Sequence, residues 1–268
     1  NKRILFSERD RNARSEWRGD VQMTLRPTHD IRHAFTLGYV QASVTDTVSI
    51  LAPDYFNGGE EDTRYLALGY TVMHDHRDSR VYPRTGDYAE LRLWRYGLGI
   101  GDRNAPDITT AYATLKHWQK LSERWTVSMT GRAKATIGAP TPYYVQEGLG
   151  YSSAIRGYEY YVIDGQHYAL GKLDAAFALI KPRSYTVNEV PLEAFRTVYV
   201  ALYLDVYADM GRVWDIQYDK QNFLAGSWQS GYGAGLDLVT SYDQVFRLEY
   251  SFNALGESGL FLHFTQPF

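Results

Sequence analysis

Two groups of side chains in this sequence carry functional groups at spacings that could do chemistry. The first would suit a metal ion and consists of His74, Asp75, His76 and Asp78. Neighbouring side chains of an extended segment point to opposite sides, so His74 and His76 would share one side. A zinc site needs at least three protein ligands, and the sequence places no third ligand beside the two histidines. We therefore expect no metal site here.

The second group could be assembled into a hydrolytic triad and consists of Ser152, Ser153, His167 and Asp174. Neither serine lies in a nucleophile elbow of the G-x-S-x-G kind. The chain contains no cysteine, which excludes a thiol nucleophile, a thiolate metal site and a disulfide framework. The sequence also lacks a Walker-type phosphate loop. It therefore predicts no catalytic residue, no cofactor and no enzyme.

Three further segments combine charged residues with glycine or proline. They are the stretch from Asp75 to Gly86, with Asp75, Arg77, Asp78, Pro83 and Gly86 at its key positions; Ile155-Arg156-Gly157-Tyr158; and Tyr207-Ala208-Asp209-Met210-Gly211. Taken alone, the first segment would be a polar turn whose backbone is set by Pro83 and Gly86. Taken alone, Arg156 would be a solvated loop residue. The role of each segment therefore depends on the elements that position it.

Alternation between apolar and polar side chains is the main local pattern of the chain. Between Val245 and Asn253, the apolar side chains are Phe246, Leu248, Tyr250 and Phe252, and the polar ones between them are Arg247, Glu249, Ser251 and Asn253. A helix would spread these two sets around its circumference, whereas a strand places each set on one face. Residues 198–209 repeat the pattern and place Asp209 on the polar face.

This alternation predicts eleven β-strands. They lie at about 16–26, 31–44, 63–74, 87–98, 109–119, 124–135, 168–180, 198–209, 230–239, 244–254 and 259–268, and the alternation is poorest in 109–119. Short turns at 27–30, 122–124 and 241–244 contrast with long loops at 51–62, 136–167 and 210–229. Bacterial membrane barrels have short periplasmic turns and longer extracellular loops. On that rule, the last strand runs toward the periplasm and ends at Phe268.

Composition favours a transmembrane barrel over a soluble sheet protein. The mean hydropathy is −0.39, yet 15% of the residues are aromatic, including 23 Tyr. Strands that face lipid on one side and a polar lumen on the other, with aromatic girdles, explain both values. No apolar stretch reaches the roughly 18 residues of a transmembrane helix. A soluble β-sandwich also alternates, but eleven long strands and so many tyrosines disfavour it. The net charge of −3 gives no reason to expect nucleic acid.

The three segments resemble motifs of one protein family. Residues 75–86 resemble its D-x-R-D…P-x-x-G connection, residues 155–158 the (V/I)-R-G-(F/Y) tip of its long sixth extracellular loop, and residues 207–211 its F-x-D-x-G strand motif. The chain is thus similar to the bacterial surface antigen superfamily, which contains the outer-membrane assembly barrels BamA and TamA and the two-partner-secretion transporters. The resemblance implies that the loop folds into the lumen and that Arg156 pairs with Asp209.

The residues themselves support this pair. Asp209 lies on the polar face of its strand, as alternation requires of a lumen residue. If the loop is buried in the barrel, Arg156 needs a partner, because an unpaired buried charge costs about 3–5 kcal/mol. A carboxylate offers the two-pronged geometry that arginine favours. Asp205 and Asp174 share plausible lumen positions and are the fallback partners.

A strand count fits the resemblance. The family barrel has sixteen strands, and counting back from Phe268 makes the chain strands six to sixteen. The loop that carries Arg156 then becomes the sixth extracellular loop, and the Asp209 strand becomes strand thirteen. An odd strand count does not suit a single-chain bacterial barrel, and an open edge does not suit lipid. We therefore expect an incomplete barrel wall, with five strands and the periplasmic POTRA domains outside this chain.

The final strand carries the terminal aromatic that the resemblance implies. Phe264 and Phe268 form this signal, whereas Gln266 and Pro267 depart from the family pattern. Proline cannot donate to a sheet ladder, so the pairing of this strand would be weakened. A weakly paired seam is also what the family mechanism would use.

Three functions are compatible with these observations. The first, implied by the resemblance, is assembly of outer-membrane proteins or translocation of polypeptide, with client proteins, accessory lipoproteins or periplasmic factors, and the lipid bilayer with its lipopolysaccharide as partners. The second is a passive channel or porin, and the third is a barrel that anchors a fused patatin-like lipase. All three imply a multi-pass β-barrel in the outer membrane of a Gram-negative-type cell. The second explains the alternation equally well but not the loop and strand motifs.

Overall fold

Eleven antiparallel strands in simple meander order form the fold. The structure is a computed structural model that describes residues 13–138, 140–186, 196–217, 222–241 and 244–265. One sheet contains all the strands in sequence order. They are β1 (Arg14–Leu25), β2 (Ile31–Val44), β3 (Asp62–Asp75), β4 (Gly86–Gly101), β5 (Ile108–Lys120), β6 (Trp125–Ile137), β7 (His167–Thr186), β8 (Thr197–Trp214), β9 (Trp228–Thr240), β10 (Gln244–Asn253) and β11 (Ser258–Thr265). The predicted all-β meander is confirmed.

The helical segments are short. They are α1 (Asp46–Leu51) and the 3-10 turns η1 (Asn57–Gly59) and η2 (Tyr143–Val145). No helix in the described part of the chain is long and apolar enough to cross a membrane.

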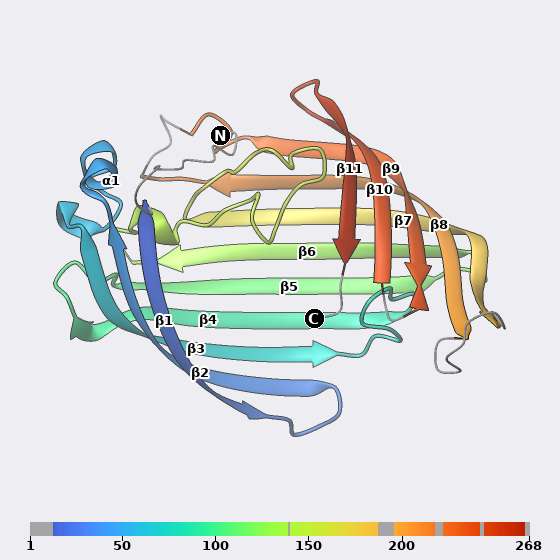
Figure 1. The fold of residues 1–268 in the computed structure, drawn as a ribbon, viewed down its shortest axis with the longest axis horizontal. Helices are drawn as coiled ribbons and strands as arrows, with labels where there is room; N and C mark the ends of the chain where they lie inside the picture. Colours follow the sequence, from blue (N-terminus) through green and yellow to red (C-terminus); the bar gives the residue numbers. More distant parts are fainter. Residues whose placement is uncertain (1–12, 139, 187–195, 218–221, 242–243, 266–268) are drawn as a thin grey trace.

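The sheet is strongly curved and open. β1 pairs with β2, β11 pairs with β10, and no ladder between described residues joins β1 to β11. In Figure 1, β1 at one edge and β9 to β11 at the other lie in front of the middle strands, so the sheet forms a trough. The expected incomplete barrel wall of eleven strands is therefore what the structure contains. We call the concave side of the trough the inner face and the convex side the outer face.

The two faces differ as the alternation predicts. On β8, exposed side chains such as Leu204 and Val206 alternate with buried ones such as Asp205 and Asp209. Leu248 of β10 and Leu236 of β9 also lie on the outer face and are 42% and 40% exposed. Phe246 and Leu202 share this outer side and are half-buried. An apolar outer face and a polar inner face are what a membrane barrel requires.

Two strands extend well beyond their predicted ends. β7 continues to Thr186 and β8 to Trp214, beyond the expected ends at 180 and 209. Residues 210–214, expected to open a long loop, still alternate and pair with β7 between His167 and Gly171. Gly211 hid this continuation, because glycine is depleted in strands. Residues 266–268, including the terminal Phe268, lie outside the described residues.

The connections at the two ends of the sheet differ in length. Turns such as 26–30 and 121–124 lie at one end, which we call the turn end, together with the longer connection 76–85. The opposite end, the loop end, carries residues 45–61 and 138–166. Loop 138–166 does not extend away from the sheet. It runs in front of β6 and β7 in Figure 1, along the inner face.

Candidate functional site: the Arg156 cluster on the inner face

Loop 138–166 is held against the sheet by its own apolar residues. Its Leu149, Ile155, Tyr158, Tyr161 and Ile163 pack with Tyr168, Leu170, Val213 and Leu224 in one buried cluster. A short bridge between Leu149 and Ile163 closes the loop on itself. Further along the loop, burial raises the pKa of the Asp164 carboxyl, which accepts hydrogen bonds from two tyrosines. The loop is therefore a packed element with one fixed path.

The loop tip is fixed residue by residue. Gly157 adopts a φ of 87°, which side chains rarely tolerate, and its carbonyl accepts a hydrogen bond of 2.8 Å from the Asn253 side chain. The Tyr158 hydroxyl donates to the Gln229 side chain at 2.8 Å. Ile155 is fully buried beside them. With its neighbours held in this way, the Arg156 side chain points toward β8.

Arg156 grips Asp209 of β8 with both its side chain and its backbone. Its Nε lies 3.0 Å from Oδ2, its Nη2 lies 2.5 Å from Oδ1, and its backbone N–H donates to Oδ2 at 2.9 Å. The Asp209 side chain is completely buried. The contact expected from the sequence is thus present, in the two-pronged form that suits a guanidinium.

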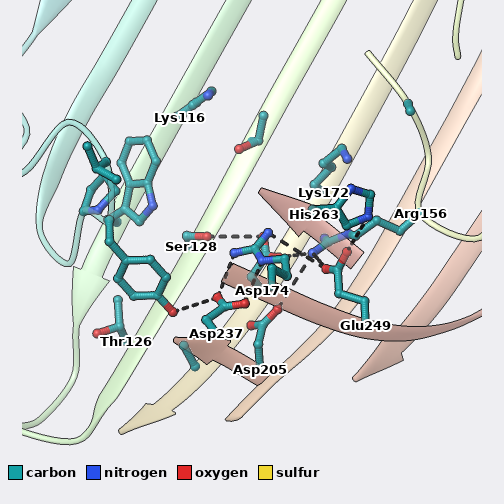
Figure 2. Close-up of a pocket in the computed structure, with 18 of the residues that line it drawn as sticks. Lys116, Thr126, Ser128, Arg156, Lys172, Asp174, Asp205, Asp237, Glu249 and His263 are labelled. Atoms are coloured by element: carbon teal, nitrogen blue, oxygen red, sulfur yellow. Dashed lines mark hydrogen bonds and ion pairs between the residues drawn. The ribbon is translucent and has the colours of Figure 1, made fainter. Parts of the chain in front are cut away.

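Other carboxylates surround the same guanidinium. Arg156 Nη1 lies 2.5 Å from Asp174 and more loosely 3.8 Å from Asp205 and 3.7 Å from Glu249. The Lys172 ammonium lies 3.2 Å from Asp209. Figure 2 shows Asp174, Asp205 and Glu249, which come from three different strands, gathered around the Arg156 guanidinium. Asp174 and Asp205, the fallback partners, therefore join Asp209 rather than replace it.

Tyr207 completes the cluster. The Arg156 guanidinium carbon lies 3.8 Å from the centre of the Tyr207 ring. A guanidinium stacks on an aromatic face through charge and through its flat shape. Tyr207 occupies the aromatic position of the strand motif, two residues before Asp209, so both residues point to the inner face.

The cluster extends to the last described strand. Arg247 of β10 donates two hydrogen bonds, of 2.7 and 2.8 Å, to Asp237 of β9. Glu249, also on β10, lies 3.2 Å from His263 of β11. The alternation placed Arg247 and Glu249 on the polar face but gave no reason to single them out. Their contacts depend on neighbouring strands and on the loop, so sequence reasoning missed them as members of the site.

Two glycines make room for the loop. A Cβ on Gly231 would lie 1.8 Å from the Arg156 carbonyl oxygen. A Cβ on Gly211, the last residue of the strand motif, would lie 2.9 Å from Leu149 and 3.0 Å from Ile155. Gly211 was expected from the motif, and Gly231 was not. Position 231 requires glycine because of Arg156, a loop residue that lies 75 residues earlier in the chain.

The motif at 75–86 builds a separate structure at the turn end. Arg77 donates two hydrogen bonds to Asp75, which raise the pKa of the guanidinium. Asp78 accepts the backbone N–H of Arg84 at 2.9 Å. Gly86 has a φ of 106° and lies so close to the chain that a Cβ would meet the His76 carbonyl oxygen at 2.0 Å. These residues shape a turn and do not form part of the Arg156 cluster.

The remaining sequence candidates have separate partners. Ser153 bonds to Tyr168, His167 Nδ1 accepts from the Thr136 backbone, and Asp174 holds Arg156, so the three do not form a triad. His74 and His76 stack 6.3 Å apart. Phe264 lies exposed on the outer face of β11, edge-on to Phe246. The site offers charge pairing and shape rather than a nucleophile.

A family comparison agrees with this geometry. The family model described as Omp85 superfamily domain matches residues 6–255. The chain belongs to the Omp85 superfamily. The family predicted from the three motifs is thereby confirmed, and the matched residues include Arg156, Asp209 and Glu249 but end before His263.

One solved structure agrees with the fold of this Omp85 domain. The crystal structure of BamA from Haemophilus ducreyi lacking POTRA domains 1–3 superposes with a TM-score of 0.67 at 11% identity, covering 94% of this chain and 54% of that one. The beta domain of the Bordetella autotransporter BrkA gives a TM-score of 0.33 at 14% identity, covering 94% of this chain and 88% of that one. This chain thus spans about half the length of the BamA chain. No curated protein matches its sequence. Family and fold together point to a bacterial outer-membrane β-barrel of the Omp85 type.

Proposed function

We propose that this Omp85 domain forms part of the barrel of a protein that inserts outer-membrane proteins or moves polypeptide across the membrane. The proposal is carried by one observation. The tip of loop 138–166 is held on the inner face by the buried pair of Arg156 with Asp209. A locked loop gives the barrel a fixed internal shape, and neither nucleotide nor covalent chemistry is required.

The working surface in this proposal is the edge of β11. β11 has a paired neighbour on one side, β10, and a free ladder on the other within the described residues. A free edge can add an incoming strand through main-chain hydrogen bonds. The Arg156 cluster reaches this strand through Glu249 and His263. The lock would thus stabilise the wall that carries the templating edge.

The same proposal assigns location and partners. The outer face lies in the lipid of the outer membrane of a Gram-negative-type cell, with the turn end toward the periplasm and the loop end toward the outside. The partners are the bilayer with its lipopolysaccharide, client outer-membrane proteins, and accessory lipoproteins or periplasmic factors.

A depletion experiment tests the function. The full-length protein is depleted from its own cell and replaced by wild type, Arg156→Ala, or Arg103→Ala as a control. Arg103 is an exposed arginine of the β4–β5 connection, far along the chain from the loop. Wild type and control should restore the amount of folded outer-membrane proteins, and Arg156→Ala should not.

The two other functions give different results in the same cells. A passive channel would change solute uptake while outer-membrane protein levels stay normal. A lipase anchor would change phospholipid hydrolysis instead. Either outcome, with normal outer-membrane protein levels after depletion, would reject the assembly function. The loop packed on the inner face already disfavours a wide open pore.

A further inference from the structure

The connection between β3 and β4 crosses the turn end of the trough. Its Val81 and Tyr82 pack against a cluster carried by β7 to β10, which consists of Ala178, Ala201, Tyr203, Val239 and Val245. In Figure 1 this connection lies near the ends of β9 and β10. These two strands are far in the sheet order from β3 and β4, which the connection joins. A turn that only joined two neighbouring strands would not need ten residues, since hairpin loops commonly have two to five.

The connection has a preformed tip. The Ser79 hydroxyl accepts the backbone N–H groups of Val81 and Tyr82, each at 3.3 Å. Arg84 donates to Thr126 Oγ1 at 3.1 Å and to the Glu123 carbonyl at 3.0 Å, which ties the tip to the beginning of β6. The motif residues described above build the frame of this turn. The tip is thereby directed into the trough.

Tyr82 makes the contact that matters most. Its ring stacks on Tyr203 of β8, with centres 4.6 Å apart and planes 26° apart. Its hydroxyl donates to Asp237 Oδ2 of β9 at 3.0 Å. Asp237 is fully buried. Loss of a hydrogen-bond donor to a buried carboxylate is destabilising, because an unsatisfied buried polar group is costly.

A line of charged contacts leads from this hydroxyl to the loop lock. Asp237 is held by Arg247, whose Nη1 lies 3.9 Å from Glu249. Glu249 lies 3.7 Å from Arg156. A cavity of about 580 Å³ separates the two ends of this line, and both Tyr82 and Arg156 line it. The turn and the loop therefore border the same cavity, and the charged residues on β9 and β10 link them.

We propose that residues 81–84 are a latch that closes the turn end of the lumen, and that Tyr82 couples this latch to the Arg156 loop tip. While the latch is closed, Tyr82 shares Asp237 with Arg247. When Tyr82 moves away, Asp237 keeps only its hydrogen bonds from Arg247. Arg247 then interacts more strongly with Asp237 and less strongly with Glu249. The charges around Arg156 are then redistributed, so that opening the turn end loosens the loop. The proposal does not depend on what the barrel transports.

Two Tyr82 variants separate the latch from the coupling. Tyr82→Phe keeps the stacked ring and removes the hydroxyl, and Tyr82→Ala removes both. The native chain has no cysteine, so Thr130→Cys, on the wall of the cavity, is a clean reporter of lumen access in the purified full-length protein. Reaction of this cysteine with a bulky maleimide should be roughly tenfold faster in Tyr82→Ala than in wild type. Loss of one hydrogen bond to a charged group shifts an equilibrium by about this factor, here the equilibrium between the closed and the open turn.

Hydrogen exchange tests the coupling. Backbone amides of residues 152–161 should exchange faster in both Tyr82→Phe and Tyr82→Ala than in wild type. Tyr88→Phe is the matched control, since Tyr88 also donates to an inner-face carboxylate, Glu90, at 2.8 Å. It should leave both measurements unchanged. Only protein that migrates as a folded barrel before heating is compared.

Each arm can overturn its part of the proposal. Unchanged cysteine labelling in Tyr82→Ala would show that the turn does not close the lumen. Unchanged loop exchange in Tyr82→Phe would show that the hydroxyl does not couple the turn to the loop. Neither measurement requires a client protein, so a failure of the assembly function and a failure of the latch are distinguishable.

Discussion

At the residue scale, the Arg156 guanidinium pairs with several carboxylates at once. This determines which substitutions in the cluster should destabilise the protein most. Asp209 has two cationic neighbours, Arg156 and Lys172. Arg156 in turn is the close partner of both Asp209 and Asp174. Removing the arginine therefore leaves more buried charge uncompensated than removing one of the carboxylates.

We expect Arg156→Ala to lower the free energy of unfolding by about 3–5 kcal/mol, the cost of breaking a buried pair. Asp209→Ala should cost less, because Arg156 keeps Asp174. The double variant should be less than additive, since both changes remove one interaction. Arg156→Lys should rescue little, because an ammonium lacks the planar fork. Denaturant unfolding of the folded barrel in detergent measures all four, and additive effects of the two alanines would refute the pair.

The glycines beside the loop give a second residue-scale prediction. Gly231→Ala would place a methyl group 1.8 Å from the Arg156 carbonyl oxygen, which is backbone and cannot swing away. Gly211→Ala meets the ends of Leu149 and Ile155, which can shift. We expect protease cleavage within residues 138–166 to increase strongly for the first and weakly for the second.

Gly131→Ala is the matched control for this series. Gly131 lies in β6, and a Cβ there would meet no atom within 4 Å. Its effect on stability should stay within about 0.5 kcal/mol, as for ordinary surface changes. If Gly131→Ala exposed the loop as much as Gly231→Ala, close packing of the loop on Gly231 would not be the cause.

At the element scale, the strands were predictable and the contacts between distant elements were not. Alternation is a local property, so it located every strand and placed Asp209 on the inner face. The end of β8 was misjudged because glycine, here Gly211, is depleted in strands. The end of β7 was misjudged because Pro182, beside the register shift between Ile180 and Arg183, cannot donate to a sheet ladder. The packing of Tyr82 on Tyr203 and the need for glycine at 231 arise from segments far apart in sequence. No local pattern contains them.

The outer face of β10 carries an element-scale prediction. Leu248→Arg should destabilise insertion into lipid vesicles by about 2–4 kcal/mol, because the side chain would face hydrocarbon. Thr130→Arg is the control, since residue 130 lines the inner cavity, where a charge can be hydrated. Folding yields in vesicles of defined thickness measure the difference. Equal losses for both variants would contradict the assignment of the two faces.

At the scale of the whole molecule, the contacts join the two ends of one curved wall. Loop 138–166 enters from the loop end and residues 76–85 enter from the turn end, and both border the same cavity. Their charged contacts meet on β8 to β10, next to β11. The family was recognisable from three short motifs because each marks a point where a loop or turn meets the wall. How those points connect to one another required the three-dimensional arrangement.

The free edge of β11 leads to the last prediction, which rests on the proposed assembly function. Leu262 of β11 and Leu248 of β10 lie directly opposite each other and share the outer face. We expect Leu262→Cys to form a disulfide with a cysteine at the client position that faces it during assembly, and none when that cysteine is moved by one position, because side chains of a strand alternate. Leu248→Cys should form none. A strand added to β11 lies two strand spacings, about 9–10 Å, from β10, and disulfides fail beyond about 7 Å between Cα atoms. Cross-linking at both positions, or at neither while assembly proceeds, would show that clients do not add to this edge.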